Sequence, residues 1–304
     1  MVTTVEKDRI LILNGKKVTL TNQQKIYWPN EKITKGQLID YYLSVAKYIL
    51  PHLKDRPLSL HRFPNGIKGH SFYQKDLDLD QTPSWVRSVP VRAISTQKDV
   101  DYLICNNEAT LAYMVNLGCI EINPWLSRTR NPDRPDFVII DLDPEEIDFR
   151  YVVETAHYIR DFLNQLEITS YCKTSGSTGL HIYIPVNAKY DYETGRSFAG
   201  YVAREVNQQL PLTTSVIRTK AQRHKKVYID FLQNSKGQTI ASAYSVRPKP
   251  GAPVSMPLDW DEINEDLHIS DFNIFNSLQR LNEKGDIWRD IRNTSNDLKK
   301  VMKK

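Results

Sequence analysis

The sequence lacks long hydrophobic runs, paired cysteines and internal repeats. No apolar run in its 304 residues approaches the roughly 20 residues that span a bilayer, and the opening, MVTTVEKDRI, has no apolar secretory core. The three cysteines, Cys105, Cys119 and Cys172, are far apart and form no CxxC pair. Neither a disulfide framework nor a zinc knuckle is therefore indicated. We expect a cytoplasmic protein whose thiols are free and buried.

Acidic residues are scarce in one stretch of an otherwise balanced chain. An apolar fraction of 40% and a charged fraction of 25% are typical of a globular protein, and the net charge of +5 favours a polyanionic partner only weakly. Between Arg218 and Lys249 the only acid is Asp230. This stretch is either a solvated basic face or a surface for phosphates, and the odd position of its single acid favours the second. Its basic residues are Arg218, Lys220, Arg223, Lys225, Lys226, Lys236, Arg247 and Lys249.

Strand and helix patterns are mixed without strict alternation, and hairpin signals recur. RILILNGKKVTLT predicts a hairpin that turns at Asn14-Gly15, and TNQQKIYWP predicts a short helix from Thr21 to Pro29. Thr34 is expected to cap a helix. This mixture predicts an α+β fold with a mixed or antiparallel catalytic sheet. The apolar stripe of the helix after Thr34 is Leu38, Ile39, Tyr42, Val45, Ala46 and Ile49.

No linker-like stretch divides the chain, which predicts one domain over residues 1–304. Within it we expect an N-terminal hairpin and helix lobe over residues 1–55 and a catalytic core over 56–260. Residues 261–304 are predicted to form a helical tail. Later in the core, we expect an amphipathic helix from Phe149 to Leu166.

The stretch FVIIDLDP, from Phe137 to Pro144, ends an apolar strand with two carboxylates. Residues i and i+2 of a strand face the same side, so Asp141 and Asp143 are predicted to lie side by side. Adjacent like charges repel, and a divalent cation is the usual partner that offsets this repulsion. The spacing therefore indicates a metal site.

A third acid interrupts another apolar strand, in KKVYIDFLQN. Alone, Asp230 is more often a structural hydrogen-bond acceptor than a metal ligand. Together with Asp141 and Asp143 it could hold two Mg²⁺ or Mn²⁺ ions, one activating a hydroxyl and the other steadying a leaving phosphate oxygen. The same three acids also fit a nuclease or a metal-dependent sugar transferase.

The stretch KTSGSTGLHIYIP places a loop of small residues, 175–179, between two strands. Its glycines would let backbone N–H groups approach an anion, and its hydroxyls would add donors. His181 opens the next strand and could point at the same anion. The alternative is an ordinary hairpin turn with a core histidine. No GKT or GKS follows, so the loop is not a Walker motif.

These stretches together resemble the archaeo-eukaryotic primase superfamily, and more closely the polymerase domain of bacterial DNA ligase D. The matches occur in the family order and extend from about Thr21 to Ile263. The resemblance implies a primase-polymerase fold with an RRM-like sheet. The matching stretches are TKGQLIDYY, LPHLKDRPLSLHRFPNGI, FYQKD, NPWLSRTRNPDRPDFVIIDLDP, KTSGSTGLHIYIP, VYIDFLQN and YSVRPKPGAPVSMPLDWDEI.

The resemblance assigns roles residue by residue. Asp141, Asp143 and Asp230 match the family's catalytic metal-binding triad. Lys25 and Lys35 match a pair that holds a 5′-phosphate of the DNA. Tyr73 matches an aromatic that stacks on a template base. The expected nucleotide-binding positions are His61, Arg62, Ser175, Gly176, Thr178, His181, Arg223, Gln233 and Arg247.

Three positions depart from the family's usual residues. Thr178 and His61 stand where lysine is frequent, and Asn123 replaces the histidine of an HPW motif. The loss of charge at Thr178 would either weaken nucleotide binding or make it depend more on Arg223 and Arg247. None of the departures touches the acid triad, so activity is expected.

The sequence therefore predicts a template-dependent nucleotidyltransferase that extends a primer 3′-hydroxyl with NTPs or dNTPs. The resemblance adds a preference for ribonucleotides, support by Mn²⁺, and work at DNA gaps and broken ends in non-homologous end joining, near the bacterial nucleoid. We expect either a stand-alone member of the family or an excised piece, and a stand-alone domain would need Ku and a separate ligase as partners. The alternatives are a DNA-end-binding scaffold with little catalysis and a metal-dependent nuclease.

Overall fold

The structure is a computed structural model of the chain, and it describes residues 8–92 and 97–302. Its residues cluster into two compact units, each built from several segments of the chain. The first unit comprises Met1–Pro124, Ala241–Val254 and Asn273–Asn282. The second unit comprises Trp125–Ile240, Ser255–Phe272 and Glu283–Lys304.

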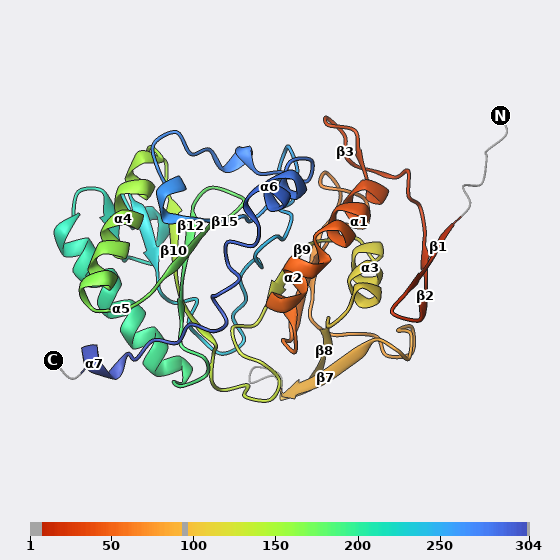
Figure 1. Cartoon of the computed structure of the whole chain (residues 1–304), viewed down its shortest axis with the longest axis horizontal. Coiled ribbons are helices and arrows are strands. Elements are labelled where there is room, and N and C mark those ends of the chain that lie inside the picture. The colour runs from red at the N-terminus through yellow and green to blue at the C-terminus, as the bar shows by residue number, and fades with distance from the viewer. Residues whose placement is uncertain (1–7, 93–96, 303–304) are drawn as a thin grey trace. The chain divides into compact units, whose positions relative to one another are not determined.

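The first unit is built on a five-stranded sheet in the order β6-β5-β8-β7, with β9 also paired to β5. Figure 1 shows α1, α2 and α3 in the red-to-yellow N-terminal part of the ribbon. The elements are β1 (Arg9–Leu13), β2 (Lys16–Leu20), β3 (Ile26–Trp28), β4 (Ile33–Thr34), α1 (Lys35–Ser44), α2 (Ala46–Leu53), β5 (Leu58–Arg62), β6 (Phe72–Gln74), β7 (Arg87–Arg92), β8 (Asp99–Ile104), α3 (Glu108–Asn116) and β9 (Cys119–Pro124).

The second unit is built on a six-stranded sheet in the order β13-β14-β10-β12-β11-β15. Only the β13–β14 pair is parallel among the pairs of this sheet in the described chain, so the sheet is mixed. The elements are β10 (Phe137–Pro144), α4 (Arg150–Gln165), β11 (Tyr171–Thr174), β12 (Leu180–Pro185), α5 (Tyr192–Gln209), β13 (Thr214–Ser215), β14 (Val227–Asp230), β15 (Pro257–Leu258) and α7 (Lys299–Met302); α6 (Ser277–Lys284) crosses the sequence boundary between the units.

One face of the six-stranded sheet forms the core of the second unit. Val138, Ile140 and Leu142 alternate along β10 and are fully buried in a cluster with apolar residues of α4 and α5. Figure 1 shows these two helices lying side by side beside the sheet. Because side chains alternate across a strand, Asp141 and Asp143 lie on the face opposite the two helices.

Most predicted elements are confirmed, including the α+β class. The hairpin turns at Asn14 and Gly15, both with positive φ, as a two-residue turn of this type requires. Thr34 caps α1, its hydroxyl accepting from the Gln37 amide in a capping box. The helix predicted from Phe149 to Leu166 is α4.

Three predictions of local structure need correction. The stretch from Thr21 to Pro29 forms turns and the short strand β3, not a helix, because Ile26-Tyr27-Trp28 are β-branched or aromatic residues that favour a strand. The helix after Thr34 is interrupted at Val45, although all six residues of its stripe are buried. In the described part of the tail, helix is confined to α6, α7 and short 3₁₀ turns.

The three cysteines are free and buried, as predicted. Burial raises the pKa of each thiol, so the thiols are protonated at neutral pH. Across residues 8–92 and 97–302, none of the helices combines the length and the apolar character needed to cross a membrane. The single-domain organisation with divisions at residues 55 and 260 stays a prediction.

Candidate active site

Two carboxylates face each other across adjacent strands of the second unit. In the antiparallel register of β10 and β14, Asp141 lies opposite Asp230, and Asp143 lies opposite Tyr228. Cross-strand partners share a face of the sheet, so the structure brings Asp141, Asp143 and Asp230 to the same face. Their grouping depends on strand register between segments nearly 90 positions apart, which local sequence does not encode.

The Asp230 carboxyl lies in an environment that disfavours its charge. Burial raises its pKa, although the Leu232 amide donates to Asp230 Oδ1 at 2.7 Å and the Arg223 guanidinium lowers the pKa in part. A half-buried carboxylate opposite a second carboxylate is a setting in which a cation is stabilising. Oxygen ligands of this kind are those that Mg²⁺ and Mn²⁺ prefer, so the donor set fits such ions.

The carboxylates are not arranged around a single point in the structure. In the described part of the chain, no three His, Cys, Asp or Glu side chains converge as a ready metal site. Asp143 Oδ1 instead accepts a hydrogen bond from the Thr178 hydroxyl at 3.2 Å. The second oxygen of the Asp143 carboxylate has no part in that hydrogen bond.

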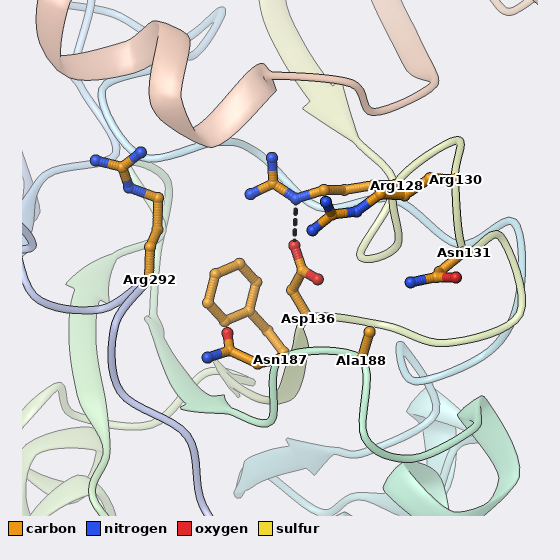
Figure 2. A pocket seen from close by; sticks show the side chains of 8 residues that line it. Arg128, Arg130, Asn131, Asp136, Asn187, Ala188 and Arg292 are labelled. Carbon is orange, nitrogen blue, oxygen red and sulfur yellow. Dashed lines mark hydrogen bonds and ion pairs between the residues drawn. The ribbon is translucent and has the colours of Figure 1, made fainter.

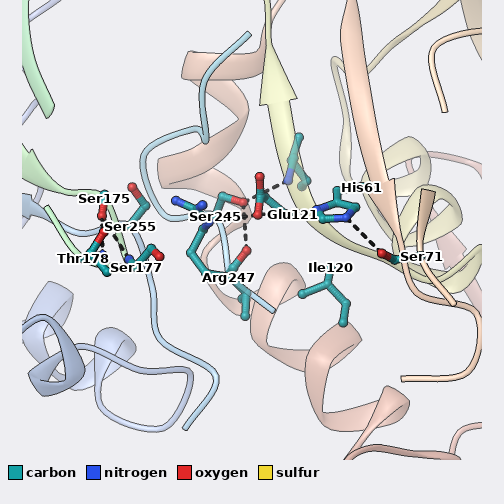
Figure 3. Close-up of polar contacts among 12 residues, drawn as sticks. His61, Ser71, Ile120, Glu121, Ser175, Ser177, Thr178, Ser245, Arg247 and Ser255 are labelled. Carbon is teal, nitrogen blue, oxygen red and sulfur yellow. Dashed lines mark hydrogen bonds and ion pairs between the residues drawn. The ribbon is translucent and has the colours of Figure 1, made fainter. Parts of the chain in front are cut away.

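The loop of residues 175–179 joins β11 to β12 and is held by its own serine. Ser175 Oγ accepts from the backbone amides of Ser177, Thr178 and Gly179 at 3.0–3.1 Å. These three amides thus point at Ser175, and the approach of the loop to an anion stays a prediction. Figure 3 shows the short contacts of this loop.

Gly179 lies against the strand that carries two of the carboxylates. A Cβ atom built on Gly179 would come within 1.7 Å of the Leu142 carbonyl oxygen. Only glycine permits this approach. The last residue of the loop therefore fixes the distance between the loop and the backbone between Asp141 and Asp143.

His181 connects the loop to the carboxylates. It lies opposite Asp141 in the β10–β12 register, and its Nε2 is 3.4 Å from Asp141 Oδ1. The other ring nitrogen, Nδ1, is 2.8 Å from Nζ of Lys173, a buried lysine on β11 that sequence analysis did not single out. The only sequence signal for Lys173 is a cation inside an apolar strand.

Arg223 is the predicted nucleotide-binding arginine that belongs to the second unit. Its guanidinium covers the Tyr228 ring at 3.7 Å, and it donates to the carbonyls of Ile217 and Arg218. A fourth contact pairs it with Glu145 at 3.5 Å. Gln233 lies in the turn that follows β14.

Several cations of the basic stretch from Arg218 to Lys249 form ion pairs within the folded chain. Lys220 pairs with Glu145 at 3.3 Å, and Lys225 pairs with Glu146 at 3.2 Å. Lys236 pairs with Asp133 at 2.5 Å. The acids come from outside the stretch, so counting charges within it overstated the available positive charge.

In the first unit, a buried acid joins two predicted nucleotide-binding residues. Glu121 Oε2 accepts from Arg247 Nε at 2.9 Å and lies 3.7 Å from His61 Nδ1. Burial alone would raise the pKa of Glu121, but His61 and Arg247 hold it below its usual value. Figure 3 shows this cluster around β5 and β9. Sequence analysis missed Glu121, whose single signal is an acid in the apolar strand CIEINP.

Tyr73 presents its ring at the surface of the first unit. The side chain is 57% exposed, and its ring stacks on His61 with centroids 4.0 Å apart, since the two residues are partners in the β5–β6 register. Arg62 is held locally, by the Leu117 carbonyl and the Gln74 side chain. An exposed ring supported from beneath is suited to stack on a base.

Lys25 and Lys35 lie close together but differ in environment. Lys35 is the first residue of α1 and is buried, and its Nζ donates to the Thr21 carbonyl at 2.7 Å. Burial and the neighbouring Lys25 lower the pKa of Lys35 to about 8. Lys25 is exposed, and its Nζ donates to Asn65 Oδ1 at 2.6 Å. Lys25 lies in a turn and not on a helix, so only Lys35 is at a helix N-terminus.

A separate pocket of about 300 Å³ lies at the other end of β10, where Phe137 begins the strand. Figure 2 shows Asp136 on its floor, paired with Arg128 Nε at 2.7 Å. None of the predicted site residues lines it. The residues that do are Arg128, Arg130, Asn131, Asp136, Phe137, Asn187, Ala188 and Arg292.

Comparison with known proteins gives consistent matches. Residues 34–288 match the family described as LigD, primase-polymerase domain. The chain is 32% identical over 276 residues to the multifunctional non-homologous end joining protein LigD of Mycolicibacterium smegmatis, covering 89% of this chain and 35% of that protein. The bifunctional LigD of Bacillus subtilis is 32% identical over 272 residues, covering 88% of this chain and 43% of that protein. The chain thus spans between a third and a half of these relatives.

A solved structure matches at the level of the fold. The polymerase domain from Mycobacterium tuberculosis ligase D, in complex with DNA, superposes with a TM-score of 0.85 at 29% identity. The match covers 92% of this chain and 99% of that one.

Proposed function

The chain belongs to the LigD primase-polymerase domain family, and we propose that it is a template-dependent nucleotidyltransferase that extends a primer 3′-hydroxyl. The observation that carries the proposal is the register that sets Asp141 opposite Asp230 and His181 on one face of the sheet. A polymerase needs carboxylates beside a triphosphate-binding loop, and the loop at 175–179 contacts Asp143 and the Leu142 carbonyl of β10.

We assign the metal-binding role to Asp141, Asp143 and Asp230. Two Mg²⁺ or Mn²⁺ ions bound there would supply the charge that activates the 3′-hydroxyl and stabilises the leaving pyrophosphate. The chain's own groups would position the triphosphate: the hydroxyls of Ser175 and Thr178, Gly176 in the loop, the His181 ring and the Arg223 guanidinium. The Thr178 hydroxyl, which donates to Asp143, lies between the loop and the carboxylates.

The remaining assignments come from family membership. His61, Arg62, Gln233 and Arg247 are proposed to contact the nucleotide, and Tyr73 to stack on a template base. The relatives are named as non-homologous end joining proteins. We propose the same pathway for this chain, acting at gaps and broken DNA ends, with Ku and a ligase as partners.

One assay separates this function from its alternatives. Labelled primer-template is incubated with the chain, NTPs and Mn²⁺, and the product lengths are compared. A polymerase gives longer product, an end-binding scaffold gives unchanged product, and a nuclease gives shorter product. Unchanged or shorter product would refute the proposed function.

Sugar choice provides a further prediction. We expect NTPs to be incorporated faster than dNTPs, as the family membership implies. The measurement is the single-turnover rate with a matched NTP and dNTP on the same primer-template. A faster rate with the dNTP would contradict it.

Recognition of a downstream 5′-phosphate is expected to depend on Lys25 and Lys35. The double change Lys25→Ala/Lys35→Ala should weaken binding to a gap with a 5′-phosphate by roughly tenfold to a hundredfold, because charge-assisted contacts contribute about 1.5–3 kcal/mol. Binding to the same gap with a 5′-hydroxyl should change little. Affinities are measured at pH 7, below the pKa of Lys35 of about 8, and at one salt concentration.

Two controls isolate the end-specific role of these lysines. Lys68 is exposed and bonds to Asn30, much as Lys25 bonds to Asn65, so Lys68→Ala should affect both gaps equally. Raising the pH from 7 to 9 deprotonates Lys35, so the wild-type preference for the 5′-phosphate should fall, and the double variant should show no such fall. If the double variant lost equal affinity for the two gaps, the lysines would contribute only general electrostatic attraction to DNA.

A further inference from the structure

Lys173 is a fully buried lysine beside the candidate active site. It lies on β11, opposite His181 in the β11–β12 register, and its exposed fraction is 0%. Lysine is rarely buried to this extent without partners for its hydrogens. Its Nζ also lies 5.8 Å from the centroid of the Tyr183 ring, two residues along β12 from His181.

The hydrogen bonds around Lys173 determine which groups donate. Nζ contacts the Thr174 carbonyl oxygen, which can only accept, at 3.5 Å. Nζ also contacts Ser255 Oγ, whose own hydrogen is directed to the Thr174 carbonyl at 2.7 Å. Ser255 Oγ therefore accepts from Lys173 and does not donate to it.

The third contact of Nζ is His181 Nδ1, at 2.8 Å. In its ammonium form Lys173 has three hydrogens and no lone pair, which matches three acceptors. The other ring nitrogen of His181, Nε2, faces the Asp141 carboxylate at 3.4 Å, which favours a proton on Nε2 independently. His181 Nδ1 must then present its lone pair to Lys173. A neutral imidazole that accepts at Nδ1 carries its proton on Nε2.

We propose that Lys173 is a positioning residue that fixes His181 as the Nε2–H tautomer. The donor then faces Asp141 Oδ1, 3.4 Å away. The consequence of this tautomer rests on the proposed function: His181 would donate a hydrogen bond to the triphosphate. Since Nε2 has no free lone pair in this tautomer, His181 is not a metal ligand, and the metal ligands remain carboxylates.

The tautomer is directly measurable in the intact protein. Two-bond ¹H–¹⁵N correlation spectra of ¹⁵N-histidine-labelled chain report which ring nitrogen carries the proton, and His181→Gln identifies the His181 signals. We expect a protonated Nε2 and an unprotonated Nδ1, unchanged by added Mg²⁺. A protonated Nδ1 in the wild-type chain would overturn the proposal, whatever the variants show.

Two variants test the role of Lys173. Lys173→Met keeps the length of the side chain but has no donor, so His181 should lose its preference for the Nε2–H tautomer. Lys173→Gln restores one donor and should recover that preference in part. Ser255→Ala removes another partner of Lys173 while leaving the His181 contact, and should keep the Nε2–H tautomer. An unaltered tautomer in Lys173→Met would show that Lys173 does not set it.

Kinetics supply a second measurement of the same role. If extension occurs, Lys173→Met should raise KM for NTP by about tenfold, with a smaller effect on kcat, because one donor to the bound triphosphate is lost. A tenfold fall in kcat with an unchanged KM would count against a role of Lys173 in holding the nucleotide. Absence of extension in the wild-type chain would refute the proposed function but leave the tautomer measurement valid.

Discussion

Replacing Asp230 with asparagine should reduce primer extension by about a thousandfold or more, because a metal-bound carboxylate contributes several kcal/mol of charge stabilisation to phosphoryl transfer. Asparagine has nearly the same size and keeps an oxygen that can accept from the Leu232 amide. The loss would therefore report on charge and not on packing. The measurement is the single-turnover rate of extension with saturating NTP and Mn²⁺.

Stability and DNA binding provide the controls for this variant. Burial raises the pKa of Asp230, so its charge is unfavourable in the folded chain at neutral pH. Removing that charge should leave the melting temperature unchanged or raise it. DNA binding should persist, since lysine and arginine hold the phosphates. Near-normal extension by Asp230→Asn would end the assignment of Asp230 as a metal ligand.

Replacing Gly179 with alanine should destabilise the chain by about 4 kcal/mol or more. The added Cβ would come within 1.7 Å of the Leu142 carbonyl oxygen and 2.9 Å of its carbon, both backbone atoms of β10. Backbone cannot move aside as a flexible side chain can, so the loop or the strand must shift. Urea unfolding at neutral pH would measure the loss as a lower midpoint.

Ser177→Ala is the matched control in the same loop. It adds no atom, and the backbone amide of residue 177 can still donate to Ser175 Oγ. We expect its free energy of unfolding to stay within about 0.5 kcal/mol of wild type. An unfolding midpoint for Gly179→Ala equal to that of Ser177→Ala would mean that the close approach to β10 is not required.

The acid triad shows how far local sequence can predict a site. Asp141 and Asp143 follow from the two-residue period of a strand, which any reading of FVIIDLDP provides. Asp230 could be proposed only from the similar pattern of its own strand. The pairing of Asp230 with Asp141 depends on strand register, which is set by the position of β10 between β12 and β14.

Long-range electrostatics account for what sequence analysis missed or overstated. The charges of Lys220, Lys225 and Lys236 are paired with acids that approach only in the folded chain. Glu121 and Lys173 are single charges within apolar strands, and their partners are defined by neighbouring strands and loops. At Ile26–Trp28 the helix prediction relied on Thr21 as a cap, although these three residues are β-branched or aromatic and pair with β4 as a strand.

Templated incorporation tests the central claim most directly. A primer ending one position before a template base is extended with each NTP in turn, for every choice of template base, at fixed Mn²⁺ and salt. If the chain is a template-dependent nucleotidyltransferase, only the complementary NTP should be added efficiently, and the preferred NTP should change with the template base. Extension that ignores the template base, or no extension with any NTP, would contradict it.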